Sequence, residues 1–182
     1  GIFGAQAWKV RSDDRHLIVL PLYHVNGQLI SVMPTLTAGA TLVMAEQFSA
    51  SRFMDQVRRH RVTTTSLVAA ALKMILGQPP SERDRENCLR LIMYAIAIPD
   101  ETWSAFEERF DVRLCDLWGM TETLGATTLN PADGLMKRNC IGLPRLGNCV
   151  AVVDDSGAEV PAGETGELVV QSRSAADGQH IW

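Results

Sequence analysis

The feature that most constrains the fold is a regular alternation of short apolar runs and amphipathic segments. The apolar runs have the length and β-branched content of buried strands, and they occupy residues 17–20, 40–44, 62–67, 91–94 and 112–117. Segments with helical spacing of apolar residues lie between them, at 27–37, 49–59, 69–76 and 99–110. Strands that alternate with helices predict an α/β fold, a mostly parallel sheet with helices on both faces.

The pattern changes after about residue 128. Turn signals become frequent, and the runs at 150–154 and 167–170 predict short antiparallel strands with a hairpin centred on residues 155–157. We therefore expect a short antiparallel β segment after the α/β part, with the boundary between Leu129 and Gly142.

Composition narrows the class of protein. The 182 residues are 46% hydrophobic and 21% charged with a net charge of −4, which excludes a disordered chain and argues against nucleic-acid or membrane-surface partners. The longest apolar runs are too short to span a bilayer. The four cysteines form no C-x-x-C pair, so we expect free, buried or half-buried thiols in a reducing, cytoplasmic setting.

The most informative polar segment follows the strand at 112–117, where open α/β sheets bind ligands. Gly119 lets backbone approach a ligand, and Trp118 offers a flat apolar face. The Thr121 hydroxyl suits a phosphate oxygen, and the Glu122 carboxylate suits Mg²⁺. A structural alternative is a turn in which Thr121 caps a short helix and Glu122 lies in its first turn.

A second candidate follows the strand at 17–20. His24 can act there as a gate, a hydrogen-bond donor or a base, or it can pack beside a helix that Asn26 caps. A third segment, with Gly163 and Gly166 ahead of a strand, is better explained by turn geometry.

Together, these three segments resemble the adenylate-forming acyl-CoA synthetase superfamily, which includes acyl-CoA ligases, luciferases and peptide-synthetase adenylation domains. The segments are Pro-Leu-Tyr-His-Val-Asn-Gly at 21–27, Trp-Gly-Met-Thr-Glu-Thr at 118–123 and Val-Pro-Ala-Gly-Glu-Thr-Gly-Glu-Leu at 160–168. The resemblance covers essentially the whole chain. From residue 61 onward, and at 78–81, the sequence is most similar to carnitine/crotonobetaine-type CoA ligases.

The resemblance implies a ligase that activates a carboxylic acid as an acyl-adenylate with ATP and Mg²⁺ and then transfers it to coenzyme A. It implies catalytic roles for His24, Thr121 and Glu122, with Glu122 also the metal ligand. The residues that it implies for nucleotide binding are Tyr94, Ala95, Trp118, Gly119, Met120 and Thr121. It further implies an α/β subdomain of the AMP-binding domain at 1–135 and the start of a distorted β-barrel subdomain at 136–182.

Several family segments have no counterpart in these 182 residues. By the resemblance, the phosphate loop belongs before Gly1, and the ribose-binding aspartate and catalytic lysine belong beyond Trp182. We expect a fragment of the large N-terminal domain that is inactive alone and works with the remaining segments of the same synthetase. Trp118 and Tyr94, at positions where the family has Tyr and Gly, keep open a non-catalytic nucleotide-binding or scaffold module. A peptide-synthetase adenylation domain is the other alternative.

Overall fold

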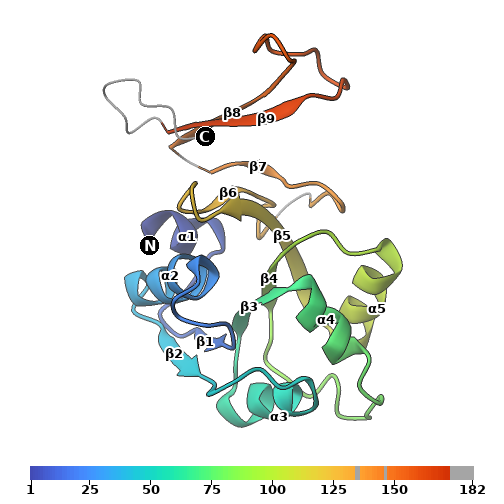
Figure 1. Ribbon diagram of the computed structural model, residues 1–182. Helices are drawn as coiled ribbons and strands as arrows, with labels where there is room; N and C mark the ends of the chain where they lie inside the picture. Colours follow the sequence, from blue (N-terminus) through green and yellow to red (C-terminus); the bar gives the residue numbers. More distant parts are fainter. Residues whose placement is uncertain (134–135, 146, 173–182) are drawn as a thin grey trace.

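A seven-stranded sheet organises the structure, a computed structural model that describes residues 1–133, 136–145 and 147–172 (Figure 1). The strand order is β2-β1-β3-β4-β5-β6-β7, and the first five strands are mutually parallel, whereas β6 and β7 are antiparallel additions at one edge. The strands are β1 (Arg15–Ile18), β2 (Thr41–Met44), β3 (Thr64–Val68), β4 (Leu91–Ala95), β5 (Arg113–Met120), β6 (Gly125–Leu129) and β7 (Leu143–Pro144).

Helices cover both faces of this sheet, as the alternation predicts. One face carries α1 (Ile2–Ala7), the π-helix η1 (Asn26–Val32) and α2 (Met33–Thr37). The other face carries α3 (Ala50–His60), α4 (Ala69–Leu76) and α5 (Asp100–Phe110). Each side encloses its own apolar core, because residues that alternate along β4 and β5 point to opposite faces.

The helices bury their apolar faces in the larger core. Phe53, Met54 and Val57 of α3 are buried, as are the aromatic residues of α5. The residue before α3 is Ser49, and its side chain makes no capping hydrogen bond with the described residues. The apolar stripe on each helix is therefore sufficient to orient it against the sheet.

Two elements differ from the predictions. The segment expected to be one α-helix at 27–37 is a π-helix followed by a short α-helix, and Pro34, which has no N–H to donate, lies in the first turn of α2. Strand β6 was not predicted. Its sequence, Gly-Ala-Thr-Thr-Leu, has weak strand signals, and the strand exists because it pairs with the end of β5.

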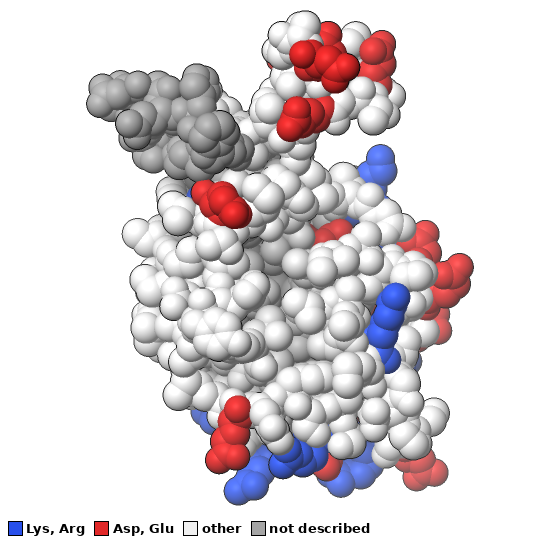
Figure 2. Space-filling model, in the orientation of Figure 1, with Lys and Arg blue, Asp and Glu red and all other residues white. Residues whose placement is uncertain are grey.

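The tail forms a separate two-stranded antiparallel sheet of β8 (Asn148–Val153) and β9 (Glu167–Ser172). The predicted turn at 155–157 is present, closed by a bridge between Val153 and Glu159, but β8 pairs with β9 farther along the chain. In Figure 2 the loop between these strands projects from the molecule with a concentration of acidic side chains. Within the described residues the tail is an open hairpin, so the barrel and the boundary at 135/136 stay predictions.

Two further expectations concern the cysteines and membranes. Among the described residues the cysteines form no disulfide, but Cys88 is exposed rather than buried, since it lies in the loop before β4. None of the helices in the described residues has the length and apolar character needed to cross a membrane.

Candidate functional site

The strand order identifies the edge of the sheet at which a ligand site is expected. In the order β2-β1-β3-β4-β5 the chain moves from β1 outward to β2 and then returns to β3 on the other side. Such a switch point leaves a crevice at the carboxyl ends of the central strands, where α/β proteins bind ligands. The loops after β1, β4 and β5 all leave the sheet at this edge, because these strands are parallel.

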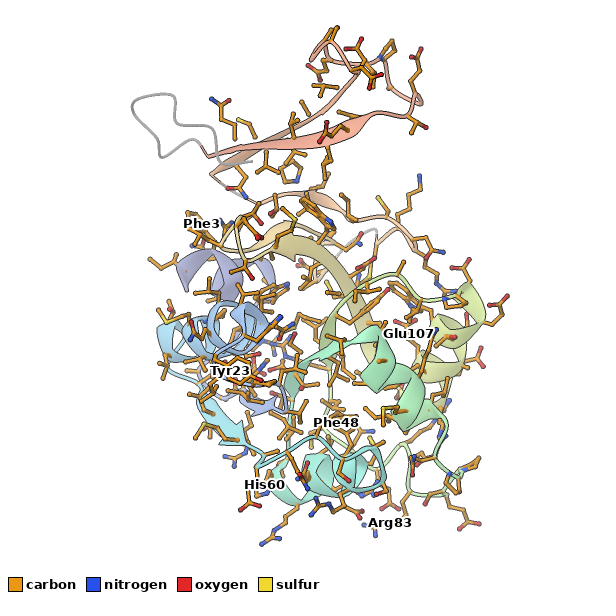
Figure 3. All side chains as sticks on the ribbon, viewed as in Figure 1. Phe3, Tyr23, Phe48, His60, Arg83 and Glu107 are labelled. Carbon is orange, nitrogen blue, oxygen red and sulfur yellow. The ribbon has the colours of Figure 1, made fainter. Side chains whose placement is uncertain are left out.

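The loop after β1 presents His24. The backbone N–H of His24 donates to Pro21 O (3.1 Å), and a side chain at Gly27 would collide with the same carbonyl, so the loop is tight. The backbone N–H of Asn26 donates to His24 Nδ1 (3.1 Å). A neutral ring whose Nδ1 is an acceptor carries its proton on Nε2, so exposed His24 offers a hydrogen-bond donor. The neighbouring Tyr23 is 87% exposed (Figure 3).

The turn after β5 presents Thr121 and Glu122. Both side chains are exposed, and neither makes a hydrogen bond or ion pair with other described residues. The Leu124 N–H donates to Thr121 O (3.1 Å), which closes the turn. A side chain at Gly119 would overlap the backbone carbonyl of Gly125, so the two strands can approach here only because position 119 is glycine.

The strand that carries this turn is longer than expected. The register of β4 against β5 ends at Ala95 and Leu117, whereas β5 continues through Trp118 to Met120. These last residues pair with β6 instead, with a register shift between Trp118 and Gly119. Trp118 and Gly119 are half-buried and Met120 is exposed, so this end of the strand contributes to the protein surface at this edge of the sheet.

The two loops meet, although two strands separate β1 from β5. A methyl group placed on Gly125 would lie 3.4 Å from Leu29 Cβ and 3.8 Å from Val25 Cγ2. The start of η1 therefore packs against the end of the turn, and the loop that carries His24 borders the turn that carries Glu122. The structure thus places the two strongest sequence candidates in neighbouring loops at one edge of the sheet.

Tyr94 and Ala95 lie at the end of β4 in this same edge. The Tyr94 ring is buried in the core beneath α5, edge-on to Trp103 with the ring centroids 5.5 Å apart. Within the described part of the chain its hydroxyl has no hydrogen-bond partner, and burial raises the pKa of that hydroxyl. Ala95 is half-buried and pairs in register with Leu117. Their nucleotide-binding roles stay predictions.

A buried carboxyl group lies within β5, on the chain leading to this turn. Asp116 pairs in register with Tyr94, and burial raises the pKa of its carboxyl to about 6, because the charged form is poorly solvated there. Glu122, in the turn that follows β5, is solvent-exposed. The two carboxyl groups therefore have different environments, and Glu122 is the one available to a cation.

The residues at the turn fit a magnesium–nucleotide pair. Among the described residues, no group of three or more His, Cys, Asp or Glu side chains could hold a metal ion. Mg²⁺ in nucleotide sites is held by one or two carboxylates together with substrate phosphates, so a single exposed carboxylate beside a free hydroxyl is sufficient. Glu122 and Thr121 supply those two groups.

Sequence comparison agrees with this geometry. The model of the family described as "AMP-binding enzyme" matches residues 2–178. The chain belongs to the AMP-binding enzyme family. A crotonobetaine/carnitine–CoA ligase of Escherichia coli O17:K52:H18 is 37% identical over 174 residues, and its counterpart in Shigella sonnei is 36% identical. The resemblance read from the three motifs is therefore confirmed.

Solved structures of this family share the fold. ATP-bound MatB from Rhodopseudomonas palustris superposes with a TM-score of 0.85 at 24% identity, covering 94% of this chain and 34% of that one. A benzoate CoA ligase from Burkholderia xenovorans LB400 has a TM-score of 0.83 at 25% identity, covering 94% and 36%. The chain covers 33% of the two curated relatives, with 94% of its own length matched. It thus spans about a third of the length of its family relatives.

Sequence reasoning missed the residues that hold these loops in place. The Asn26 N–H that orients His24 is a backbone group and leaves no sequence signal. The hydroxyls of Thr123 and Thr127 form a hydrogen bond of 2.7 Å. Because this bond depends on the position of β6, which the sequence did not predict, the pair could not be identified from the sequence. The last Thr of the 118–123 motif was the only available signal.

Proposed function

We propose that this chain is part of an ATP-dependent acyl-CoA ligase that activates a carboxylic acid as an acyl-adenylate and transfers the acyl group to coenzyme A. Membership of the AMP-binding family and the similarity to curated CoA ligases support the reaction class. The observation that carries the proposal is the exposed Thr121–Glu122 turn at the carboxyl edge of β5, bordered by the His24 loop.

Each residue has a role that its position supports. Thr121 would donate its hydroxyl to a nucleotide phosphate, and Glu122 would hold Mg²⁺. When bound, Mg²⁺ supplies charge neutralisation on the phosphates. His24, with its proton on Nε2, would donate a hydrogen bond to the carboxylate of the acid substrate and orient it. Trp118 and Gly119 would line the nucleotide side of the crevice.

The substrate is proposed to be a small carboxylic acid, and the acids in the relatives' names define a test panel: crotonobetaine, carnitine and benzoate. ATP, Mg²⁺ and coenzyme A would be the co-reactants. The remaining segments of the synthetase would complete the site, and we propose a cytoplasmic location.

Thioester formation tests this proposal. The full-length synthetase is incubated with ATP, Mg²⁺, coenzyme A and each acid of the panel, and acyl-CoA and AMP are quantified by mass spectrometry. We expect equal amounts of both products with at least one acid. AMP and adenylate without acyl-CoA, together with loading of a carrier-protein thiol, would favour a peptide-synthetase adenylation domain instead.

Calorimetry distinguishes the non-catalytic alternative. The full-length synthetase is expected to bind Mg²⁺–ATP stoichiometrically. Failure of the folded, intact protein to bind nucleotide would overturn the ligase proposal in favour of a scaffold module.

A further inference from the structure

The tip of the β5–β6 hairpin combines exposed polar groups with a rigid base. Thr121 and Glu122 project without side-chain partners among the described residues, which would ordinarily leave a hairpin tip mobile. Directly beneath them Thr123 is only 5% exposed and Thr127 is fully buried. The side chain of Glu122 is therefore exposed, whereas that of the next residue, Thr123, is buried.

The Thr123 hydroxyl uses its full hydrogen-bonding capacity. Its Oγ1 accepts from the Met120 N–H (3.0 Å) and from the Thr127 hydroxyl (2.7 Å). Its own proton can go to Met120 O (3.1 Å) or Gly125 O (3.3 Å). A hydroxyl has one donor and two acceptor sites, so all three are engaged. These bonds join Thr123 to Met120 at the end of β5, and to Gly125 and Thr127 of β6.

The neighbouring residues Thr127 and Thr128 on β6 differ in their side-chain hydrogen bonds. The Thr127 hydroxyl donates to Thr123, whereas the hydroxyl of Thr128, also buried, has no hydrogen-bond partner among the described residues. Loss of the Thr127 hydroxyl should therefore weaken the hydrogen-bond network around Thr123, while loss of the Thr128 hydroxyl should leave that network unchanged.

We propose that Thr123 is a positioning residue that holds the Thr121 hydroxyl and the Glu122 carboxylate in place for Mg²⁺–ATP, and that Thr127 orients Thr123 through its hydroxyl. This role rests on the proposed adenylation function. Thr123 itself reaches none of the reacting groups, because it is buried under the turn. Its contribution is to restrict the turn to one geometry, and small misplacements of reacting groups reduce rates strongly.

The test compares four variants of the full-length synthetase by acid-dependent ATP–pyrophosphate exchange. Thr123→Val should lower kcat by about 10- to 100-fold and raise the Mg²⁺ concentration for half-maximal rate, while KM for the acid stays constant. Thr123→Ser, which keeps the hydroxyl, should restore kcat to within about threefold of wild type. Thr127→Val should be intermediate, and Thr128→Val should match wild type.

Hydrogen exchange on the same proteins gives a readout that does not depend on activity. The Met120 amide donates to Thr123 Oγ1, so its exchange should become roughly tenfold faster in Thr123→Val and stay unchanged in Thr128→Val. Melting temperatures show whether each variant is folded. If Thr123→Val does not fold, the comparison of Thr127→Val with Thr128→Val decides the question by the same two readouts.

The outcomes separate the two proposals. An active wild type with a Thr123→Val variant of unchanged kcat and Mg²⁺ dependence overturns the positioning role and leaves the ligase function standing. Reduced activity in Thr123→Ser as severe as in Thr123→Val also overturns it. A folded wild type with no exchange activity for any acid overturns the ligase function, and the positioning role with it, even where Met120 protection behaves as expected.

Discussion

Among single residues, Glu122 carries the most specific prediction. Its carboxylate is exposed, makes no hydrogen bond or ion pair with other described residues and is the group proposed to hold Mg²⁺. Glu122→Ala in the full-length synthetase should reduce adenylation about 100-fold or more and leave the melting temperature unchanged. Initial rates across a Mg²⁺ titration check this. Glu82→Ala, which removes an exposed carboxylate in the loop before β4, is the matched control and should keep the wild-type rate.

Two buried groups, His16 and Asp116, give opposite pH dependences of stability. Burial lowers the pKa of His16 from 6.5 to about 4, so its stabilising contribution is complete above pH 6.5 and is lost as the pH falls toward 4. Burial raises the pKa of Asp116 from 3.8 to about 6, so its contribution is complete below pH 3.8 and is lost as the pH rises through 6. Between about pH 4 and 6 the two slopes oppose each other.

Asp116→Asn isolates one of these slopes. The variant keeps a neutral side chain of similar shape at every pH, so its free energy of unfolding relative to wild type should increase by about 2–3 kcal/mol as the pH rises from 4 to 7. Urea unfolding of both proteins at several pH values measures the difference, in which the other titrating groups cancel. A difference that stays constant over this range would mean that Asp116 titrates normally in the folded protein.

At the scale of elements, one arginine joins α4 to α5. Arg109 forms an ion pair with Asp84 at 2.7 Å and donates to the carbonyl oxygens at the end of α4 and in the following loop, those of Leu76, Gln78 and Pro79. Both charged groups are largely buried. The planar guanidinium thus satisfies carbonyls that the helix end leaves unpaired.

Arg109→Met should therefore destabilise the fold by about 2–4 kcal/mol, because it leaves Asp84 and several carbonyls without a partner. Chemical denaturation measures the effect. Arg83→Met is the control: Arg83 pairs with Glu86 in an exposed ion pair, and we expect no resolvable change. Equal stability of the two variants would contradict the structural role of Arg109.

The sequence predicted the elements that are buried because of their own composition. It missed the elements that form only by pairing with another strand. Apolar runs such as β3 and stripes such as that of α5 are buried because of their own composition, so their positions were correct to within a few residues. Strand β6 and the extension of β5 through Met120 arise from pairing with each other. The turn at 121–124 was consequently open to interpretation as a helix start, and the hydrogen bonds that Thr123 makes could not be anticipated.

At the candidate site, residue chemistry predicted the groups at the surface but not their support. His24, Thr121 and Glu122 were identified from their types and their places after strands. The contact of Val25 and Leu29 with Gly125, which brings the two loops together, depends on how η1 packs on β6. Tyr94 illustrates the limit: the resemblance implies a nucleotide-binding role, the ring packs against Trp103 in the core, and the role itself stays a prediction.

At the scale of the whole molecule, the length of the chain relative to its relatives bears on its activity. The 182 residues correspond to about a third of their curated relatives. We predict that the isolated chain folds, with the two cores on either side of its sheet, but catalyses no acid-dependent ATP–pyrophosphate exchange. Circular dichroism together with the exchange assay checks both parts. Robust exchange by the isolated chain would show that this segment alone contains the catalytic groups.

The most direct test of the central claim is ATP–pyrophosphate exchange by the full-length synthetase with the acid panel defined above. We predict exchange that requires both Mg²⁺ and an acid of the panel. We also predict that this exchange is lost in Glu122→Ala and retained in Glu82→Ala. Exchange that persists at the wild-type rate in Glu122→Ala would contradict the assignment of this turn as the magnesium–nucleotide site.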